Sequence, residues 1–247
     1  MHGASAAPLM LLPGLLCDAR MFAAQRASFP DAQVIDGFGP VDDLVRMAQI
    51  ALAAAPPRIS LLGHSMGARV ALEMIRLAPD RIERLALVST GVHEPRDGEA
   101  ARRHALLEIG RRQGAAALVD RWLPGMVAPE RIGDAALVEP LHRMCVQAGV
   151  DTFAAQIAAL LGRPEVESLL PSLRCPTLVL VGGEDAWSPP PQHAEIAAAI
   201  PGARLRMIPG AGHMLPAEAP EAFDAAVAEW LALPISNDVH IKRGTCP

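Results

Sequence analysis

The chain has 247 residues, of which 51% are hydrophobic and 20% are charged, and its formal net charge is −5. This composition is typical of a folded globular protein and excludes a disordered chain. The length is enough for one large domain or for a domain with an insertion. Arginines occur in short pairs, such as Arg102-Arg103 and Arg111-Arg112, rather than in a basic block, so we expect no nucleic-acid partner.

Cysteine usage and hydropathy bound the compartment. Cys17, Cys145, Cys175 and Cys246 lie far apart, without a C-x-x-C pair or metal-ligand spacing, which favours a reducing compartment and predicts no metal site. The apolar N-terminal stretch lacks a basic leader and is interrupted by Pro13-Gly14, so it predicts a core strand rather than a signal peptide. No segment reaches the roughly 18 apolar residues of a membrane helix. We expect a cytoplasmic protein without a membrane partner.

Strand-like and helical patterns alternate along most of the chain. In chain order, apolar runs predict strands at residues 8–12, 33–35, 59–62, 84–89, 176–181 and 204–208. Helices are expected at 42–55, 66–78, 193–199 and 218–233, the first of them capped by Asp42 or Asp43. Apolar strands separated by helices indicate an α/β protein with a mostly parallel sheet of about six strands and helices on both faces.

The middle of the chain interrupts this alternation. Between Ser89 and Pro176 there is no strand pattern, and helices are predicted at 99–112, 115–123, 134–148 and 152–161. Because structureless loops of such length are rare, we expect a helical insertion. The predicted organisation is a core at 1–91 and 175–234, a helical cap at 92–174, and a tail at 235–247 that is either disordered or vector-derived.

A G-x-S-x-G motif stands where the predicted strand at 59–62 passes into the predicted helix at 66–78. Its members are Gly63, Ser65 and Gly67. At a sharp strand-to-helix turn a Cβ on either side of the apex would collide with backbone, which explains the two glycines. This pattern is typical of a nucleophile elbow, which exposes the serine. The alternative interpretation is a flexible Gly-Ser turn.

A serine nucleophile needs a base and an acid that orients the base. His213, in a loop of small residues after the last predicted strand, is the preferred base among the eight histidines. Asp185, after the fifth predicted strand, is the preferred acid, with Glu184 and Glu94 as rivals. Functional groups gather at the carboxyl ends of parallel strands, so Ser65, Asp185 and His213 are predicted to form a catalytic triad.

Two backbone amides are predicted to form the oxyanion hole. One is the N–H of Met66, next to the nucleophile and at a helix start; the other is the N–H of Leu15, with that of Leu16 as the alternative. A pocket is expected between the sheet and the cap. Its predicted substrate-binding residues are Trp187, Met214, Trp122, Met126 and Phe153.

Four segments resemble the α/β-hydrolase superfamily, in its lid-bearing branch of cofactor-free serine hydrolases. They are LMLLPGLLCDARMF, LLGHSMGARVALEMIRLAPDRIERLALVSTG, CPTLVLVGGEDAWSPP and IPGAGHMLPAEAPEAF. The resemblance implies the α/β-hydrolase fold, catalysis by Ser65, Asp185 and His213, and no cofactor. Two features depart from the family. Pro13-Gly14 stands where His-Gly is usual, and only seven residues precede Pro8, so the first two family strands are expected to be absent.

The predicted function is hydrolysis of carboxylic esters with small or medium acyl groups, through an acyl-enzyme intermediate. A neutral substrate is favoured because no arginine stands at a motif position. The first alternative is a C–C bond hydrolase, enol-lactonase or lyase that acts on an acidic small molecule. It would place basic residues such as Arg121, Arg143 or Arg163 in the cap pocket. The second alternative is a ligand receptor with a retained triad and no turnover. The expected partner is a small-molecule ester, and the expected state is a monomer or homodimer.

Overall fold

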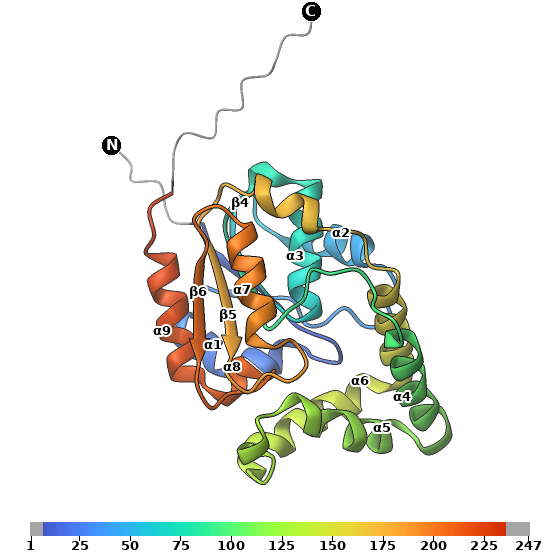
Figure 1. Cartoon of the computed structure of the whole chain (residues 1–247). Coiled ribbons are helices and arrows are strands. Elements are labelled where there is room, and N and C mark those ends of the chain that lie inside the picture. The colour runs from blue at the N-terminus through green and yellow to red at the C-terminus, as the bar shows by residue number, and fades with distance from the viewer. Residues whose placement is uncertain (1–6, 236–247) are drawn as a thin grey trace, which may run out of the picture.

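A six-stranded sheet forms the centre of the computed structural model, which describes residues 7–235 (Figure 1). The strand order is β2-β1-β3-β4-β5-β6, and every neighbouring pair is parallel. The strands are β1 (Leu9–Leu12), β2 (Gln33–Val34), β3 (Ile59–His64), β4 (Ile82–Val88), β5 (Thr177–Gly182) and β6 (Arg204–Ile208). The predicted α/β architecture with a parallel sheet of six strands is therefore confirmed.

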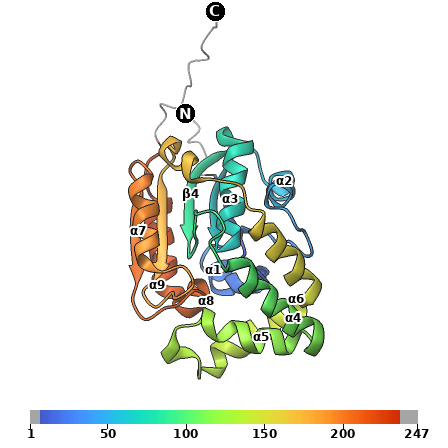
Figure 2. The same cartoon turned by 45° about the vertical axis from the view of Figure 1, so that its right-hand side comes forward.

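Helices cover both faces of the sheet (Figures 1 and 2). On one face α1 (Ala23–Ser28) contacts α9 (Pro220–Leu231). On the other face α2 (Leu44–Ala54) packs against α3 (Met66–Leu77), and α7 (Pro190–Ala199) lies against β5 and β6. The four-residue helix α8 (Leu215–Glu218) precedes α9. This cover accounts for the burial of every residue of β1, β3, β4 and β5.

Local signals explain some helix ends and miss others. Of the two candidate caps of α2, Asp43 is the one used, because its carboxylate accepts a hydrogen bond from the Arg46 N–H at 2.7 Å. A single helix is predicted at 218–233, but the structure divides this stretch into α8 and α9. The break lies at Ala219, which is not helical (φ −138°, ψ 59°) and precedes Pro220, as a residue before proline tends to be. Helix α1 has only six residues and was not predicted.

Three further helices lie together beyond the carboxyl ends of the strands (Figure 2). They are α4 (Glu99–Gln113), α5 (Ala115–Trp122) and α6 (Ala135–Leu161), and they contact one another. They fall within the stretch predicted to be a helical insertion, and the domain limits proposed for it, 92–174, stay a prediction. All of the predicted tail except residue 235 lies outside the described residues.

Helix α6 spans 27 residues, is apolar, and is broken in the middle. Two helices are predicted here, and Gly149 (φ 85°, ψ 169°) separates them. By length and composition α6 is the one helix within residues 7–235 that could cross a membrane. The break leaves two pieces that are each too short for that, and Leu141, Met144 and Ile157 are buried in the hydrophobic core. The apolar composition of α6 is explained by its packing against the hydrophobic core.

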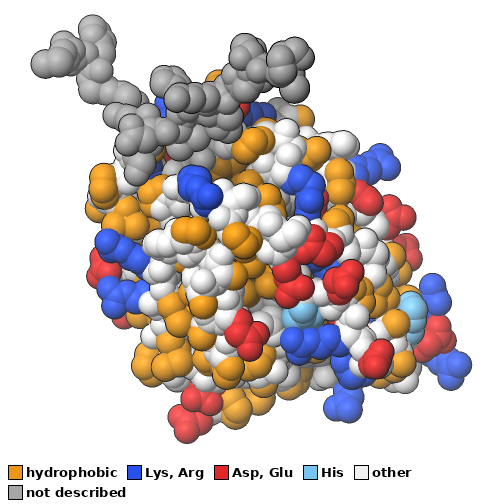
Figure 3. Space-filling model, turned by 45° about the horizontal axis from the view of Figure 1, so that its top comes forward, with side chains coloured by type: hydrophobic (Ala, Val, Ile, Leu, Met, Phe, Trp, Pro, Cys, Tyr) orange, Lys and Arg blue, Asp and Glu red, His pale blue; other side chains and the backbone are white. Residues whose placement is uncertain are grey.

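The surface carries both signs of charge. On the face shown in Figure 3, acidic and basic side chains are interspersed with apolar ones. This face therefore has no extended patch of one sign.

The start of α3 packs directly against the end of β1. A Cβ on Gly67 would lie 2.7 Å from the carbonyl oxygen of Pro13 and still closer to that of Leu12. Real Cβ atoms do not approach backbone so closely, so only glycine allows this contact. The contact holds the turn between β3 and α3 against the loop that follows β1.

Replacing Gly67 should therefore destabilise the fold. We expect Gly67→Ala to lower the free energy of unfolding by about 2 kcal/mol or more, because the backbone of β1 cannot move away as a flexible side chain could. Urea denaturation would measure the change. Gly133→Ala is the matched control, since nothing lies within 4 Å of its Cβ position. Equal stability of the two variants would contradict the packing argument.

Candidate active site

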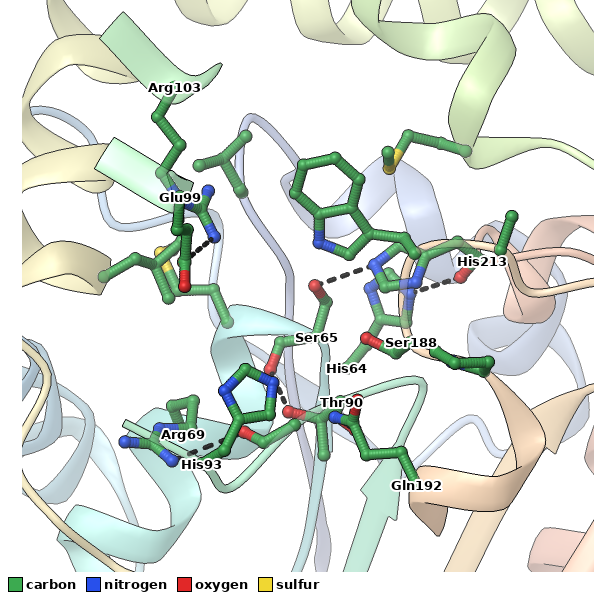
Figure 4. Close-up of a pocket in the computed structure, with 18 of the residues that line it drawn as sticks. His64, Ser65, Arg69, Thr90, His93, Glu99, Arg103, Ser188, Gln192 and His213 are labelled. Carbon is green, nitrogen blue, oxygen red and sulfur yellow. Dashed lines mark hydrogen bonds and ion pairs between the residues drawn. The ribbon is translucent and has the colours of Figure 1, made fainter. Parts of the chain in front are cut away.

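Ser65 occupies a strained turn between β3 and α3. Its backbone has φ 54° and ψ −116°, a region that L-residues rarely adopt. Two hydrogen bonds hold it there: the Ser65 N–H donates to the carbonyl of Val88 at 2.8 Å, and the Thr90 hydroxyl donates to the carbonyl of Ser65 at 3.0 Å. The turn projects the serine side chain into a cavity at the carboxyl end of the sheet (Figure 4).

His213 lies within hydrogen-bond reach of this serine. Its Nε2 is 2.9 Å from Ser65 Oγ, and its Nδ1 is 2.9 Å from Asp185 Oδ2 and 3.1 Å from Asp185 Oδ1 (Figure 4). The loop after β6 is positioned by two backbone bonds, because the N–H groups of His213 and Met214 both donate to the carbonyl of Met126, at 2.9 and 3.0 Å. The structure thus brings the three predicted residues together, with His213 between Ser65 and Asp185.

Asp185 follows β5 and is held as a carboxylate. Burial acts to raise its pKa, but the neighbouring His213 and hydrogen bonds outweigh burial and lower the pKa below its ordinary value. Its Oδ1 accepts the backbone N–H groups of Trp187 at 3.0 Å and Ser188 at 2.7 Å. The rival acids Glu184 and Glu94 are both exposed. Asp185 is therefore the acid that orients His213.

His64 packs against the His213 ring and binds its backbone carbonyl, a role that the sequence does not reveal. Its buried ring lies 5.4 Å from the His213 ring, and its Nε2 is 2.8 Å from the His213 carbonyl oxygen. Burial, together with the charge of His213, lowers the pKa of His64 to about 3, so the ring is neutral and Nε2–H donates. A second buried histidine, His193, accepts the Thr90 N–H at 2.9 Å and steadies the loop after β4.

The loop after β1 offers one amide to the cavity and uses another for support. Leu15 and Met66 both line the cavity with Ser65, and within residues 7–235 neither backbone N–H has a hydrogen-bond partner. The Leu16 N–H, by contrast, donates to the side chain of Gln156 on α6 at 2.8 Å. The Leu16 N–H is thus already paired, whereas the Leu15 and Met66 N–H groups are available to donate hydrogen bonds to a group bound in the cavity.

A cavity of about 390 Å³ opens above these groups. It is lined by four of the five predicted substrate-binding residues: Trp122, Met126, Trp187 and Met214. The prediction of Phe153 was wrong. Its side chain is buried in the hydrophobic core on the second half of α6, and Leu160 of the same half belongs to the lining instead.

One wall of the cavity is basic, whereas the sequence favours a neutral substrate and allows basic residues only under the acidic-substrate alternative. Five arginines belong to the lining, namely Arg69, Arg96, Arg102, Arg103 and Arg163, and Glu99 is its one carboxylate. Burial acts to raise the Glu99 pKa, but contacts with Arg163 and Arg103 outweigh burial and lower the pKa to about 2. Of the three basic residues expected for an acidic substrate, Arg163 lines this cavity, whereas Arg121 and Arg143 do not.

Comparison with known proteins finds similarity to hydrolases. A model of the "Alpha/beta hydrolase family" matches residues 2–226. The chain is 29% identical to the sn-1-specific diacylglycerol lipase ABHD11 of Mus musculus over 70% of its own length, and the match spans 58% of that lipase. It is 29% identical to the putative carbamate hydrolase RutD of Caulobacter sp. (strain K31), covering 88% of this chain and 80% of that protein.

A solved structure is similar over nearly the whole chain. It is a thermophilic esterase from Thermogutta terrifontis with malate bound, which is 30% identical and superposes with a TM-score of 0.81. The superposition covers 92% of this chain and 90% of the esterase.

The Glu99 ion pairs should make stability depend on pH. Since the folded-state pKa lies near 2, below the ordinary 4.5, the contribution of this carboxylate is complete above about pH 4.5 and is lost as the pH falls towards 2. We expect the stability advantage of wild type over Glu99→Gln to shrink over that window by about 1 kcal/mol, after allowance for solvent screening. Urea unfolding at several pH values measures it, with Glu108→Gln on the same helix as control. An advantage that stays constant down to pH 2.5 would contradict this account.

Proposed function

The chain belongs to the alpha/beta hydrolase family, and we propose that it hydrolyses carboxylic esters with Ser65 as the nucleophile. The observation that carries the proposal is the continuous hydrogen-bonded chain from Ser65 Oγ through His213 to Asp185, with both links at 2.9 Å. A serine hydroxyl becomes a nucleophile when a base accepts its proton and a fixed acid orients that base. Similarity to a thermophilic esterase, at 30% identity, supports the choice of an ester bond.

In the proposed first half-reaction, Ser65 Oγ attacks the ester carbonyl while His213 Nε2 takes the hydroxyl proton. The N–H groups of Leu15 and Met66 donate hydrogen bonds to the carbonyl oxygen as negative charge develops on it. The Met66 amide also lies at the first turn of α3, whose dipole favours negative charge. Because these donors are fixed by backbone, they need no reorganisation during the reaction.

Collapse of the tetrahedral intermediate releases the alcohol, which His213 protonates, and leaves an acyl group on Ser65. In the second half-reaction, His213 removes a proton from water, which attacks the acyl-enzyme and releases the acid. Asp185 keeps the imidazole in the tautomer that has its proton on Nδ1 and stabilises the imidazolium as it forms. Every step uses groups of this chain, so the proposed reaction needs no metal or cofactor.

The cavity bounds the size of the proposed substrate. A volume of about 390 Å³ suits small or medium acyl groups, in agreement with the expectation from sequence. Leu15, Met66, Met126 and Met214 supply apolar surface near the reacting carbonyl. Methionine side chains adapt to different shapes, so this part of the cavity should tolerate several acyl chains.

A second candidate is cleavage of a C–C or lactone bond in an acidic small molecule. The observation that favours it is the presence of Arg163 in the cavity lining, as that alternative predicts. Turnover of acidic dienoates or enol-lactones with little activity on simple esters would distinguish it from the first candidate.

Removing either end of the hydrogen-bonded chain should abolish turnover. We expect Ser65→Ala to lower kcat for p-nitrophenyl esters by about a million-fold. Asp185→Asn should lower it by about ten thousand-fold, because His213 would then adopt the wrong tautomer. Steady-state hydrolysis over a series of acyl lengths measures both. A fluorophosphonate probe should label wild type and not Ser65→Ala.

Glu184→Gln is the matched control for Asp185→Asn. Glu184 precedes Asp185 in the chain, but its side chain is exposed, and the carboxylate hydrogen-bonded to His213 is that of Asp185. Its removal should leave kcat within about twofold of wild type. Equal losses in the two variants would show that the loop as a whole, rather than the Asp185 carboxylate, supports activity. Full activity of Ser65→Ala would overturn the proposed function.

A further inference from the structure

The charged residues of the cavity lining are strongly unbalanced. Five arginines face a single carboxylate, Glu99, while the face of the protein in Figure 3 mixes both signs of charge. The cavity lining thus carries an excess of positive charge. Such an excess lowers the free energy of an anion inside the cavity, and the low-dielectric walls strengthen the effect.

Two of the five arginines, Arg69 and Arg163, donate most of their hydrogen bonds within the protein. They contribute positive charge to the cavity rather than hydrogen bonds to a ligand. Arg69 donates to the carbonyl groups of Val92 at 2.5 Å and Pro164 at 2.6 Å. Arg163 donates to the carbonyl groups of His93 at 2.9 Å and Leu160 at 2.8 Å. Both side chains are buried, and burial, with the nearby charge of Arg163, lowers the pKa of Arg69 to about 10. These two guanidiniums leave few donors for a ligand.

Glu99 neutralises only part of this charge. Its two carboxylate oxygens accept from Arg163 Nη1 and Nη2 at 2.7 and 2.8 Å, and Arg103 Nε donates to the same carboxylate at 3.0 Å. One carboxylate is therefore shared by two guanidiniums. The bond also fixes Arg103 on the cavity wall, where its guanidinium carbon lies 5.5 Å from the centre of the Trp187 ring.

The remaining donors lie at the mouth of the cavity. Arg96 and Arg102 are exposed, and within residues 7–235 neither guanidinium makes a hydrogen bond or an ion pair. In Arg103 the hydrogen bonds to Glu99 use Nε and Nη2, which leaves Nη1. These groups supply what carboxylate recognition needs, namely several charged N–H donors around one point.

The position of the basic wall relative to Ser65 and His213 indicates which part of a substrate it would contact. In Figure 4, Glu99 and Arg103 lie across the cavity from His213, with Ser65 between them. His213 must reach the oxygen of the departing alcohol in order to protonate it, so the leaving group lies on the His213 side. The acyl chain then extends towards the arginines.

We propose that Arg96, Arg102 and Arg103 form a carboxylate-binding subsite, and that the preferred substrates are monoesters of short dicarboxylic acids. The inference rests on the proposed ester hydrolysis and specifies the substrate class of the same site. The free carboxylate, at the far end of the acyl chain, binds to the arginines. The ester carbonyl at the other end is then held against Ser65.

The test compares monomethyl and dimethyl esters of succinate, glutarate and adipate, with the acid released followed by pH-stat titration. We expect wild type to show a kcat/KM for the best monomethyl ester about tenfold higher than for the corresponding dimethyl ester. This preference should decrease as salt is added, since the subsite lies at an exposed mouth. Arg102→Gln and the double variant Arg96→Gln/Arg102→Gln should reduce the preference stepwise towards unity.

Arg111→Gln is the matched control. It lies on α4 like Arg102, is exposed, and removes the same charge, but it pairs with Glu108 at 3.1 Å and is not part of the lining. Its preference should equal that of wild type. A wild-type preference at or below unity, or an equal loss in Arg111→Gln and Arg102→Gln, would overturn the subsite while leaving ester hydrolysis intact.

Binding to Ser65→Ala separates failure of the subsite from failure of the proposed function. Calorimetric titration with monomethyl adipate and with dimethyl adipate needs no turnover. If wild type hydrolyses neither series, ester hydrolysis is overturned. Tighter binding of the monomethyl ester that is lost in Ser65→Ala/Arg102→Gln would then still support the subsite, and equal binding of both esters would overturn it.

Discussion

The site depends on the close approach of two backbones where β3 turns into α3. Gly67 brings the first turn of the helix against the carbonyl groups at the end of β1, where no side chain fits. Beside this contact, Ser65 adopts a backbone conformation that L-residues rarely adopt, and bonds to the Val88 carbonyl and from the Thr90 hydroxyl hold it there. The same contact places the loop that carries Leu15 next to the serine, so one packing constraint positions the proposed nucleophile and the two proposed amide donors.

Hydrogen bonds connect the helical segments beyond the sheet to the loops that carry Leu15 and His213. Gln156 of α6 binds the Leu16 N–H, and the Met126 carbonyl accepts the amides of His213 and Met214. The buried carboxylate of Glu218 links the same parts, because it accepts the N–H groups of Ala128 and Gly212, both at 2.9 Å. A movement of these helical segments would therefore disturb the loop that carries Leu15 and the loop that carries His213 together.

The two sides of the cavity differ in charge. On the His213 side, burial keeps His64 neutral, and the Asp185 carboxylate is held by its hydrogen bonds, which confines charge to the His213–Asp185 pair. On the opposite side, the guanidiniums of Arg103 and Arg163 share the Glu99 carboxylate. A basic wall opposite His213 accords with the proposed substrates, whose ester bond and free carboxylate lie at opposite ends.

Sequence alone determined the parallel sheet, the position of Ser65 and its partners, and four of the lining residues, because strand periodicity, glycine spacing and strand ends are local properties. Contacts between distant segments were decided by the tertiary structure. The choice of Leu15 over Leu16 required Gln156, which lies 140 residues away. The basic wall gathers residues from separate elements whose spacing in the chain carries no pattern, and the burial of Phe153 depends on how α6 packs in the core. Motifs of neighbouring residues can be recognised in the sequence, whereas the residues that surround a site come together only when distant segments of the chain pack.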